Sequence, residues 1–242
     1  MNLTDRACHF CKSTLVLNGN VCRDLPEIAV GICGNCALTQ LVDFSHIHDS
    51  YYLIDGSLPE NIESERKRTK HWNRKRLHQI SLNISDLTNK TVLDYGCGTG
   101  GFLEMAQGSF GRVMGFDLNQ NICKAHLKNN WECYNSIEEI KTEQIDIIVM
   151  FHVLEHSKKP WDLIKQISQH FVYTNYFVIE VPNTDEALNS LFHSEDYRKN
   201  HYSSQHLWYY TPDTIKSVVQ RAGLTIRYET QIQRYLLSNI FG

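Results

Sequence analysis

The stretch VLDYGCGTGG, residues 92–101, decides the fold of this 242-residue chain. Apolar residues lead to an acidic residue and then to closely spaced glycines, a pattern that predicts a buried strand, a tight turn and the start of a helix. Glycine lets the backbone of such a turn approach a bound ligand closely. The stretch therefore predicts a ligand-binding loop at the end of a strand.

Strand and helix patterns alternate on the C-terminal side of this loop, which predicts an α/β fold with a doubly wound, mostly parallel sheet of seven strands. The expected strands cover residues 91–95, 112–117, 131–134, 145–151, 176–181 and 224–230, with a last edge strand or tail at 231–242. Residues 183–210 interrupt the alternation as an insert. A helix is expected to begin at Thr211-Pro212-Asp213 and to end at Gly223.

The glycine loop fits two ligand classes. Gly96, Gly98 and Gly101 match the GxGxxG pattern of dinucleotide-binding folds. However, the carboxylate of Asp94 beneath the loop opposes a pyrophosphate and suits a cationic ligand such as S-adenosylmethionine, which carries a sulfonium and an ammonium group. Asp117, at the end of the second strand, is placed to accept both ribose hydroxyl hydrogens of either cofactor.

The first 36 residues contain two CxxC pairs separated by 21 residues, an arrangement of the zinc-ribbon type. The expected ligands of a structural Zn²⁺ are Cys8, Cys11, Cys33 and Cys36. We expect Gly34 to relieve the second turn sterically. The alternative is a set of core cysteines without metal, and Cys22 and His9 are the reserve ligands.

Composition limits the class of protein. With 42% hydrophobic and 21% charged residues the chain resembles an ordinary globular protein, and disorder and coiled coils are excluded. A net charge of −3 disfavours nucleic acid as an obligate partner. An apolar run long enough to span a bilayer and a signal-peptide pattern are both missing from the sequence, so we expect a cytoplasmic protein with no membrane span. The oligomeric state is not indicated.

Three domains are expected: a zinc ribbon at 1–50, a connector and helix at 51–90, and a ligand-binding domain at 91–242 that contains the insert. The helix, at 61–82, carries seven Lys and Arg residues. These residues either bind phosphate or form a solvated face.

The motifs VLDYGCGTG, VMGFD and IDIIVMFHVLEH, within residues 91–181, together resemble class I S-adenosylmethionine-dependent methyltransferases (EC 2.1.1), whose fold is Rossmann-like. The resemblance implies cofactor contacts by a set of residues at the strand ends. They are Asp94, Gly96, Gly98, Gly100, Asp117, Leu118, Asn135, Ser136, Phe151 and His152. Many relatives have Asp near the position of Asn135, where this sequence does not.

A wider resemblance, to nucleotide-sugar C-methyltransferases and their shorter relatives in natural-product and surface-polysaccharide pathways, rests on four further features. They are the four-cysteine ribbon, CALTQL, the VPN after the fifth strand and QHLWYYTPDTIKSVVQRAGL. The sequence departs from the pattern of these enzymes in two ways. They carry a further C-terminal domain for which this sequence has no residues, and their Tyr-x-Glu-His element is Ser203-Ser204-Gln205-His206 here.

Methyl transfer needs alignment of the acceptor and, for a protonated acceptor, a base. His206 is the first candidate base and His152 the second, and a structural role for His206 is the alternative. Glu155 and His156 follow as third candidates or as ligands of a divalent cation.

The expected substrate is a small polar molecule: a sugar, a nucleotide-linked sugar or a surface-polysaccharide precursor. The alternatives are a zinc-ribbon RNA methyltransferase, and a cofactor-binding or scaffolding protein without activity.

Overall fold

The computed structural model describes residues 6–48, 50–54, 61–141, 145–186, 189 and 194–232. The chain divides into two compact units. We call the first, Ile47–Val153 with Gln166–Glu180, the glycine-loop unit. The second, Met1–His46 with Leu154–Lys165 and Val181–Gly242, is the cysteine unit.

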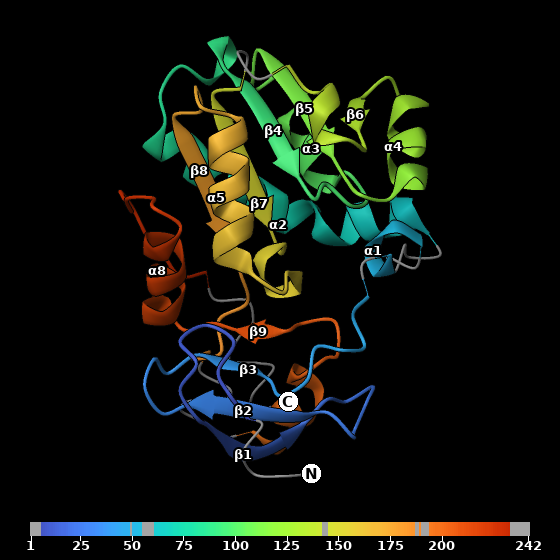
Figure 1. Cartoon of the computed structure of the whole chain (residues 1–242). Helices are drawn as coiled ribbons and strands as arrows, with labels where there is room; N and C mark the ends of the chain where they lie inside the picture. Colours follow the sequence, from blue (N-terminus) through green and yellow to red (C-terminus); the bar gives the residue numbers. More distant parts are fainter. Residues whose placement is uncertain are drawn as a thin grey trace. The chain divides into compact units, whose positions relative to one another are not determined.

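The glycine-loop unit contains a sheet of five parallel strands in the order β6-β5-β4-β7-β8 (Figure 1). The strands are β4 (Thr91–Tyr95), β5 (Arg112–Phe116), β6 (Glu132–Tyr134), β7 (Ile147–Phe151) and β8 (Tyr176–Glu180). The central strands β4 and β7 are almost fully buried, as expected for a parallel sheet covered on both faces. All five strands lie where the sequence predicts them, to within two residues at each end.

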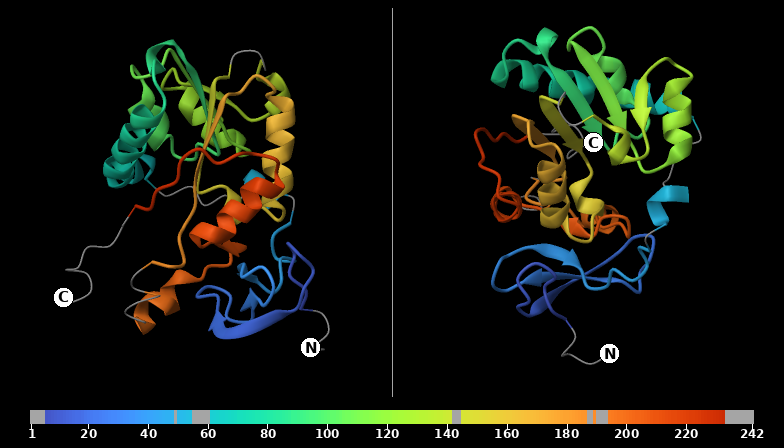
Figure 2. Two further views of the ribbon diagram at one scale, coloured as in Figure 1. Left: turned by 90° about the vertical axis from the view of Figure 1, so that its left-hand side faces the viewer. Right: turned by 45° about the horizontal axis from the view of Figure 1, so that its top comes forward.

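Helices of several lengths belong to the same unit. They are α1 (Tyr51–Ile54), α2 (Ile62–Asn83), α3 (Gly101–Ala106) and α4 (Gln120–Leu127), with short 3₁₀ helices η2 (Leu87–Asn89) and η3 (Ile137–Glu139). Figure 2 (left) shows α2 on one side of the sheet and the second half of α5 (Pro160–His170) on the other. A core cluster joins residues of β4, β5, β6 and β7 to residues of α2, α3 and α4.

Helix α2 confirms the helix expected at 61–82. The side chain of Asn61 caps it by accepting a hydrogen bond from the backbone N–H of Ser64 at 2.9 Å. Its only fully buried residues are Asn73 and Ile80. The helix thus covers the core with a narrow stripe and leaves most of its surface in water.

The expectation of seven strands is wrong for the described part of the chain, which has five strands in this sheet. Residues 224–230, expected as a strand, have no strand structure. Their apolar residues alternate with polar ones, but no strand of the described residues pairs with them, and backbone pairing is what makes an alternating segment a strand. Of the expected last strand or tail, residues 233–242 lie outside the described residues.

The cysteine unit contains a separate antiparallel sheet in the order β1-β2-β3-β9 (Figure 1). Its strands are β1 (Leu15–Val21), β2 (Ala29–Cys33), β3 (Thr39–Leu41) and β9 (Trp208–Tyr209). The fourth strand therefore comes from the insert at 183–210, more than 160 residues after β3 in the chain. We predicted the N-terminal ribbon, but not that the insert extends its sheet.

The two ends of the insert are tied together. Asn183 and Tyr210 form a parallel bridge, and the N–H of Thr184 donates to the carbonyl of Tyr210 at 2.7 Å. The insert contains α7 (Glu195–His201), and α8 (Pro212–Arg221) follows it. Helix α8 begins as predicted, with Thr211 and Thr214 forming a capping box ahead of the first turn.

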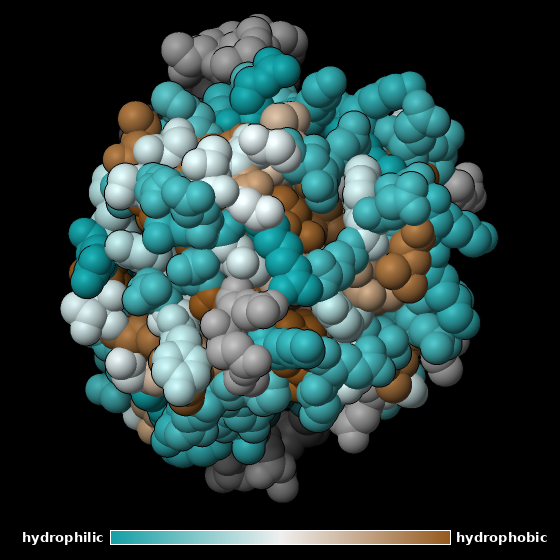
Figure 3. Space-filling model, turned by 90° about the horizontal axis from the view of Figure 1, so that it is seen from above, coloured by the Kyte–Doolittle hydropathy of each residue, from teal (hydrophilic) through white to brown (hydrophobic). Residues whose placement is uncertain are grey.

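Within the described residues, no helix is long and apolar enough to cross a membrane. Helix α2, the longest, is polar along most of its length. On the face of the molecule drawn in Figure 3, hydrophilic residues predominate and hydrophobic ones show in small areas among them.

Candidate functional site

The four predicted zinc ligands come together in the cysteine unit. The Sγ atoms of Cys8, Cys11, Cys33 and Cys36 all lie within 4.8 Å of one another. The closest approaches are 3.6 Å between Cys8 and Cys36 and 3.4 Å between Cys11 and Cys33. Four thiolates around zinc, at Zn–S distances of about 2.3 Å, are separated by about 3.8 Å. The cluster therefore fits a tetrahedral zinc ion, which would complete this small unit's core.

Two similar turns position these cysteines. The N–H of Lys12 donates to the carbonyl of Cys8 at 2.9 Å, and the N–H of Ala37 donates to the carbonyl of Cys33 at 3.0 Å. Lys12 and Ala37 have φ values of +67° and +59°. The left-handed residue in each turn is thus the one after the second cysteine, and our expectation that Gly34 relieves the turn is wrong, because Gly34 is not among the residues with positive φ.

Hydrogen bonds to sulfur favour the thiolate form of Cys11 in this cluster, whereas burial raises the pKa of Cys8 and Cys36. The N–H of Cys36 donates to Sγ of Cys33 at 3.5 Å, and the amide of Asn35 donates to Sγ of Cys11 at 3.7 Å. Although burial raises the pKa of Cys11, hydrogen bonds from Ser13 and from neighbouring groups lower it to about 6. Thiolates are the form that binds zinc.

Neither reserve ligand is part of this cluster. The ring of His9 stacks on Phe44, with centroids 4.2 Å apart. Cys22 is fully buried elsewhere in the unit, and burial raises the pKa of its thiol to about 12.

In the glycine-loop unit, three glycines of the loop have the left-handed backbone conformation that glycine adopts most readily. Gly96, Gly98 and Gly100 have φ values of +79°, +48° and +79°. A Cβ atom at Gly96 would meet Val153 at 2.7 Å, and one at Gly100 would meet the ring of His126 at 2.5 Å. A Cβ at Gly98 would meet no described atom within 4 Å. The outer glycines are needed for packing, and the middle one leaves space over the loop for a ligand.

Two side chains donate hydrogen bonds to backbone carbonyls of the glycine loop. The ring of His126 donates from Nε2 to the carbonyl of Gly98 at 2.8 Å, and Arg66 donates from Nε to the carbonyl of Thr99 at 2.5 Å. Arg66 also lies over the ring of Trp131, 4.5 Å from its centroid. Our sequence reasoning missed these roles, although Arg66 belongs to the basic helix that it singled out.

The two acidic residues lie at neighbouring strand ends, as predicted. Asp117, after β5, accepts hydrogen bonds from the N–H groups of Gly98 and Asn119, both at 2.9 Å. Each carboxylate oxygen can accept a second hydrogen bond, so ribose hydroxyls can still be bound. Asp94, in β4, is buried with 3% exposure, and this burial raises the pKa of its carboxyl group to about 7.

The residues expected near adenine follow the next strand ends. Leu118 comes directly after Asp117 and is 46% exposed, although it is apolar. Asn135 and Ser136 follow β6, and the hydroxyl of Ser136 donates to the carboxylate of Glu138. Carboxyl ends of parallel strands are the usual ligand-binding edge of such a sheet.

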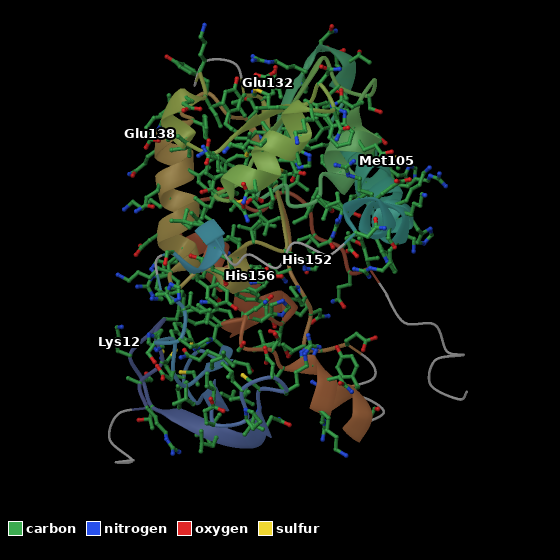
Figure 4. The ribbon with its side chains drawn as sticks, turned by 90° about the vertical axis from the view of Figure 1, so that its right-hand side faces the viewer. Lys12, Met105, Glu132, Glu138, His152 and His156 are labelled. Carbon is green, nitrogen blue, oxygen red and sulfur yellow. The ribbon has the colours of Figure 1, made fainter. Side chains whose placement is uncertain are left out.

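At the end of β7, Phe151 and His152 lie beside an ion pair that sequence reasoning missed. Arg76 donates from Nε and Nη2 to both carboxylate oxygens of Glu180, at 2.9 and 2.7 Å. His152 (Figure 4) has φ +58°, and its Nε2 lies 3.2 Å from Oε1 of Glu180. Burial acts to raise the pKa of Glu180, but hydrogen bonds from Arg76 and His152 hold it well below its ordinary value. The sequence did contain a signal for this ion pair: Glu180 is the one charged residue of the otherwise apolar strand YFVIE and lies at its carboxyl end.

His206 lies in the cysteine unit, together with Glu155 and His156. Ligand atoms of these three side chains are within 4.8 Å of one another. In the segment Ser203-Ser204-Gln205, which stands where the family has Tyr-x-Glu, Ser204 makes structural hydrogen bonds. Ser204 donates from its N–H and hydroxyl to the two carboxylate oxygens of Asp24, at 2.8 and 2.7 Å.

A family model described as a methyltransferase domain matches residues 65–229, which is more than half of the chain. The chain belongs to this methyltransferase family. S-adenosylmethionine is the methyl donor of such domains, and the glycine loop with its two acids fits that cofactor. The expectation of an S-adenosylmethionine-dependent methyltransferase (EC 2.1.1) is confirmed at the level of the domain.

Part of the chain is similar to an O-methyltransferase of ubiquinone biosynthesis. Over 116 residues the chain is 37% identical to the mitochondrial ubiquinone biosynthesis O-methyltransferase of Candida albicans. This match covers 43% of the chain and 33% of that protein, so the chain spans about a third of the length of this relative.

Solved structures show the same fold. The magnesium protoporphyrin IX methyltransferase of Synechocystis PCC 6803, with bound SAH, is similar with a TM-score of 0.54 and 12% identity. That similarity covers 77% of this chain and 91% of the other. A plantazolicin methyltransferase, in complex with a monoazolic desmethylPZN analogue and SAH, has a TM-score of 0.50 and 17% identity over 71% of each chain. At these identities the likeness establishes the fold and leaves the acceptor open.

Proposed function

We propose that this protein transfers a methyl group from S-adenosylmethionine to a small polar acceptor: a sugar, a nucleotide-linked sugar or a surface-polysaccharide precursor. One observation carries the cofactor part of this proposal. The open space over Gly98 lies beside Asp117, whose carboxylate is hydrogen-bonded to the Gly98 N–H. The sequence motifs shared with nucleotide-sugar C-methyltransferases support the acceptor class.

The residues that hold the cofactor have separate tasks. Asp117 accepts the ribose hydroxyl hydrogens, and the negative charge of ionised Asp94 attracts the ammonium and sulfonium groups. Leu118 packs on the adenine ring, and Asn135 and Ser136 contact its edge. S-adenosylmethionine supplies an electrophilic methyl group, whose bond to sulfur breaks as its bond to the acceptor forms.

We propose that either His152 or His206 is the base that accepts the proton lost by the methyl acceptor. The contact between His152 Nε2 and Glu180 orients the imidazole and favours the tautomer with hydrogen on Nε2, which leaves the proton-accepting lone pair on Nδ1. Glu180 also stabilises the imidazolium that forms when the proton arrives. These contacts support His152, whereas His206 is supported by its place in the family-like sequence.

The basic residues of α2 favour a small acceptor over RNA. Arg66 and Arg76 make contacts inside the glycine-loop unit, and Lys67 and Arg68 pair with Glu63 and Glu65 of the same helix. Such pairs reduce the positive potential that RNA binding requires. An RNA acceptor is therefore the second outcome of the test rather than a second proposal.

The test uses S-adenosylmethionine labelled in its methyl group, with a pool of nucleotide sugars and polar metabolites in one reaction and total RNA in another. We expect label in a nuclease-resistant small product. Label in nuclease-sensitive material would overturn the proposed acceptor class, and no stabilisation of the protein by S-adenosylhomocysteine would overturn the cofactor site itself.

The base is tested by His152→Asn, since Asn tolerates the left-handed backbone at this position. We expect kcat to fall about 100-fold or more, with a smaller change in the affinity for S-adenosylhomocysteine. His78→Asn, at an exposed position on α2, is the matched control. Loss of activity in His206→Gln but not in His152→Asn would transfer the role to His206.

A further inference from the structure

Three side chains of the cysteine unit form a second group of metal-binding type, separate from the four cysteines. Glu155 and His156 belong to the 3₁₀ helix η5 (Leu154–His156), and His206 lies just before β9. A carboxylate oxygen and two ring nitrogens of these residues lie within 4.8 Å of one another. Figure 4 shows His156 among the side chains of this region.

Hydrogen bonds fix η5 against the segment that carries His206. The N–H of Leu207 donates to the carbonyl of Glu155 at 2.7 Å, and the indole N–H of Trp208 donates to the carbonyl of Ser157 at 2.8 Å. Trp208 is fully buried. Residues about 50 positions apart in the chain are therefore held in place by the fold, before any ligand binds.

The tautomer of His156 is the one that binds a metal through Nε2. Its Nδ1 lies 2.9 Å from the carbonyl oxygen of Gln205, which can only accept a hydrogen bond. The ring hydrogen is thus on Nδ1, and the lone pair is on Nε2. Metal-binding histidines usually donate their other ring N–H in this manner. The rings of His156 and His206 are 4.9 Å apart at an interplanar angle of 79°.

The third ligand brings negative charge into a buried place. Glu155 has no exposed surface. A buried carboxylate beside two imidazoles is stabilised by a bound cation.

We propose that Glu155, His156 and His206 bind a divalent transition-metal ion. Two imidazoles and one carboxylate suit Mn²⁺, Fe²⁺, Co²⁺ or Zn²⁺, whereas the four thiolates select zinc. Three protein ligands leave coordination positions for water or for an oxygen of another molecule, unlike the closed four-cysteine site. The lone pair of His206 then belongs to the metal, so His152 accepts the acceptor's proton in the reaction proposed above.

Mn²⁺ is the probe, because it prefers nitrogen and oxygen ligands over thiolates. The full chain, with its cysteine site saturated with zinc, is titrated with Mn²⁺, and free Mn²⁺ is followed by electron paramagnetic resonance. We expect one Mn²⁺ bound per chain. Glu155→Gln and His206→Gln, which keep side-chain size and polarity, should each weaken binding about 10-fold or more, whereas the exposed His78→Gln should bind as the wild type does.

Metal analysis after zinc loading gives a second measurement. We expect two zinc ions in the wild type and one in His206→Gln, with circular dichroism confirming that the variant is folded. The proposal is wrong if the wild type binds no Mn²⁺ at millimolar concentration and holds only one zinc ion. It is also wrong if both variants bind metal as the wild type does. Because these measurements need no methyl transfer, their failure is distinct from failure of the proposed function.

Discussion

Asp94→Asn provides a quantitative test of the cofactor site, because it separates the folding role of this side chain from its binding role. In the folded protein, burial raises the pKa of Asp94 from 3.8 to about 7. Each pKa unit corresponds to about 1.4 kcal/mol. The folded state thus disfavours the ionised carboxylate by about 4 kcal/mol relative to the unfolded chain.

The sign follows from proton binding. Between pH 4 and pH 7 the folded protein keeps the proton on Asp94, and the unfolded chain releases it. The free energy of unfolding therefore decreases as pH rises through this window, and the loss is complete above pH 7. Asparagine has nearly the same shape and never ionises. We expect Asp94→Asn to have near wild-type stability at pH 4 and to gain up to about 4 kcal/mol over the wild type at pH 8.

Urea denaturation at pH 4, 6 and 8 measures this difference, and Glu104→Gln, at an exposed position of α3, is the control. The same variant should bind S-adenosylmethionine more weakly, because the charge opposite its cationic groups is gone. In the wild type, affinity should decrease as pH falls below 7, since Asp94 is then protonated. A variant that is less stable than the wild type at pH 8, or a difference that does not change with pH, would refute the reasoning.

Three further predictions concern the ion pair, the cysteine site and the loop. Glu180→Gln leaves the guanidinium of Arg76 without its carboxylate partner and should lower the free energy of unfolding by about 3 kcal/mol, as measured by urea denaturation. Because the pKa of Glu180 is lowered in the folded protein, this loss of stability should be largest above pH 5 and should shrink as pH falls below 4. Cys33→Ser should abolish zinc binding at the four-cysteine site and lower the thermal stability of the cysteine unit, and an unchanged melting curve with zinc absent from that site would contradict a structural metal. Gly100→Ala should destabilise the fold by about 2 kcal/mol through its clash with a buried ring, whereas Gly98→Ala should fold but lose affinity for S-adenosylhomocysteine in calorimetry.

The local pattern of the sequence was sufficient to predict most of the glycine-loop unit. Apolar runs of four to seven residues and closely spaced glycines are short-range signals, so the five strands and the tight turn at the glycine loop were predicted. The same holds for the CxxC turns, whose cysteines lie near one another in the chain, and for the cap of α8. The residues 224–230 were mispredicted because an alternating pattern shows which face is apolar and says nothing of a partner strand.

Contacts between residues far apart in the chain were decided only by the tertiary structure. Glu180 pairs with Arg76, which is 104 positions away in the chain, and His206 lies near Glu155, which is about 50 positions away. The insert also supplied a fourth strand to the N-terminal sheet, which no motif indicated. A charged or imidazole side chain can be satisfied by many partners, and its own neighbours in the sequence do not specify which one. The sequence alone therefore determined which functional groups lie at the strand ends. The tertiary structure determined which buried groups form ion pairs and which lie close enough to bind the same ligand.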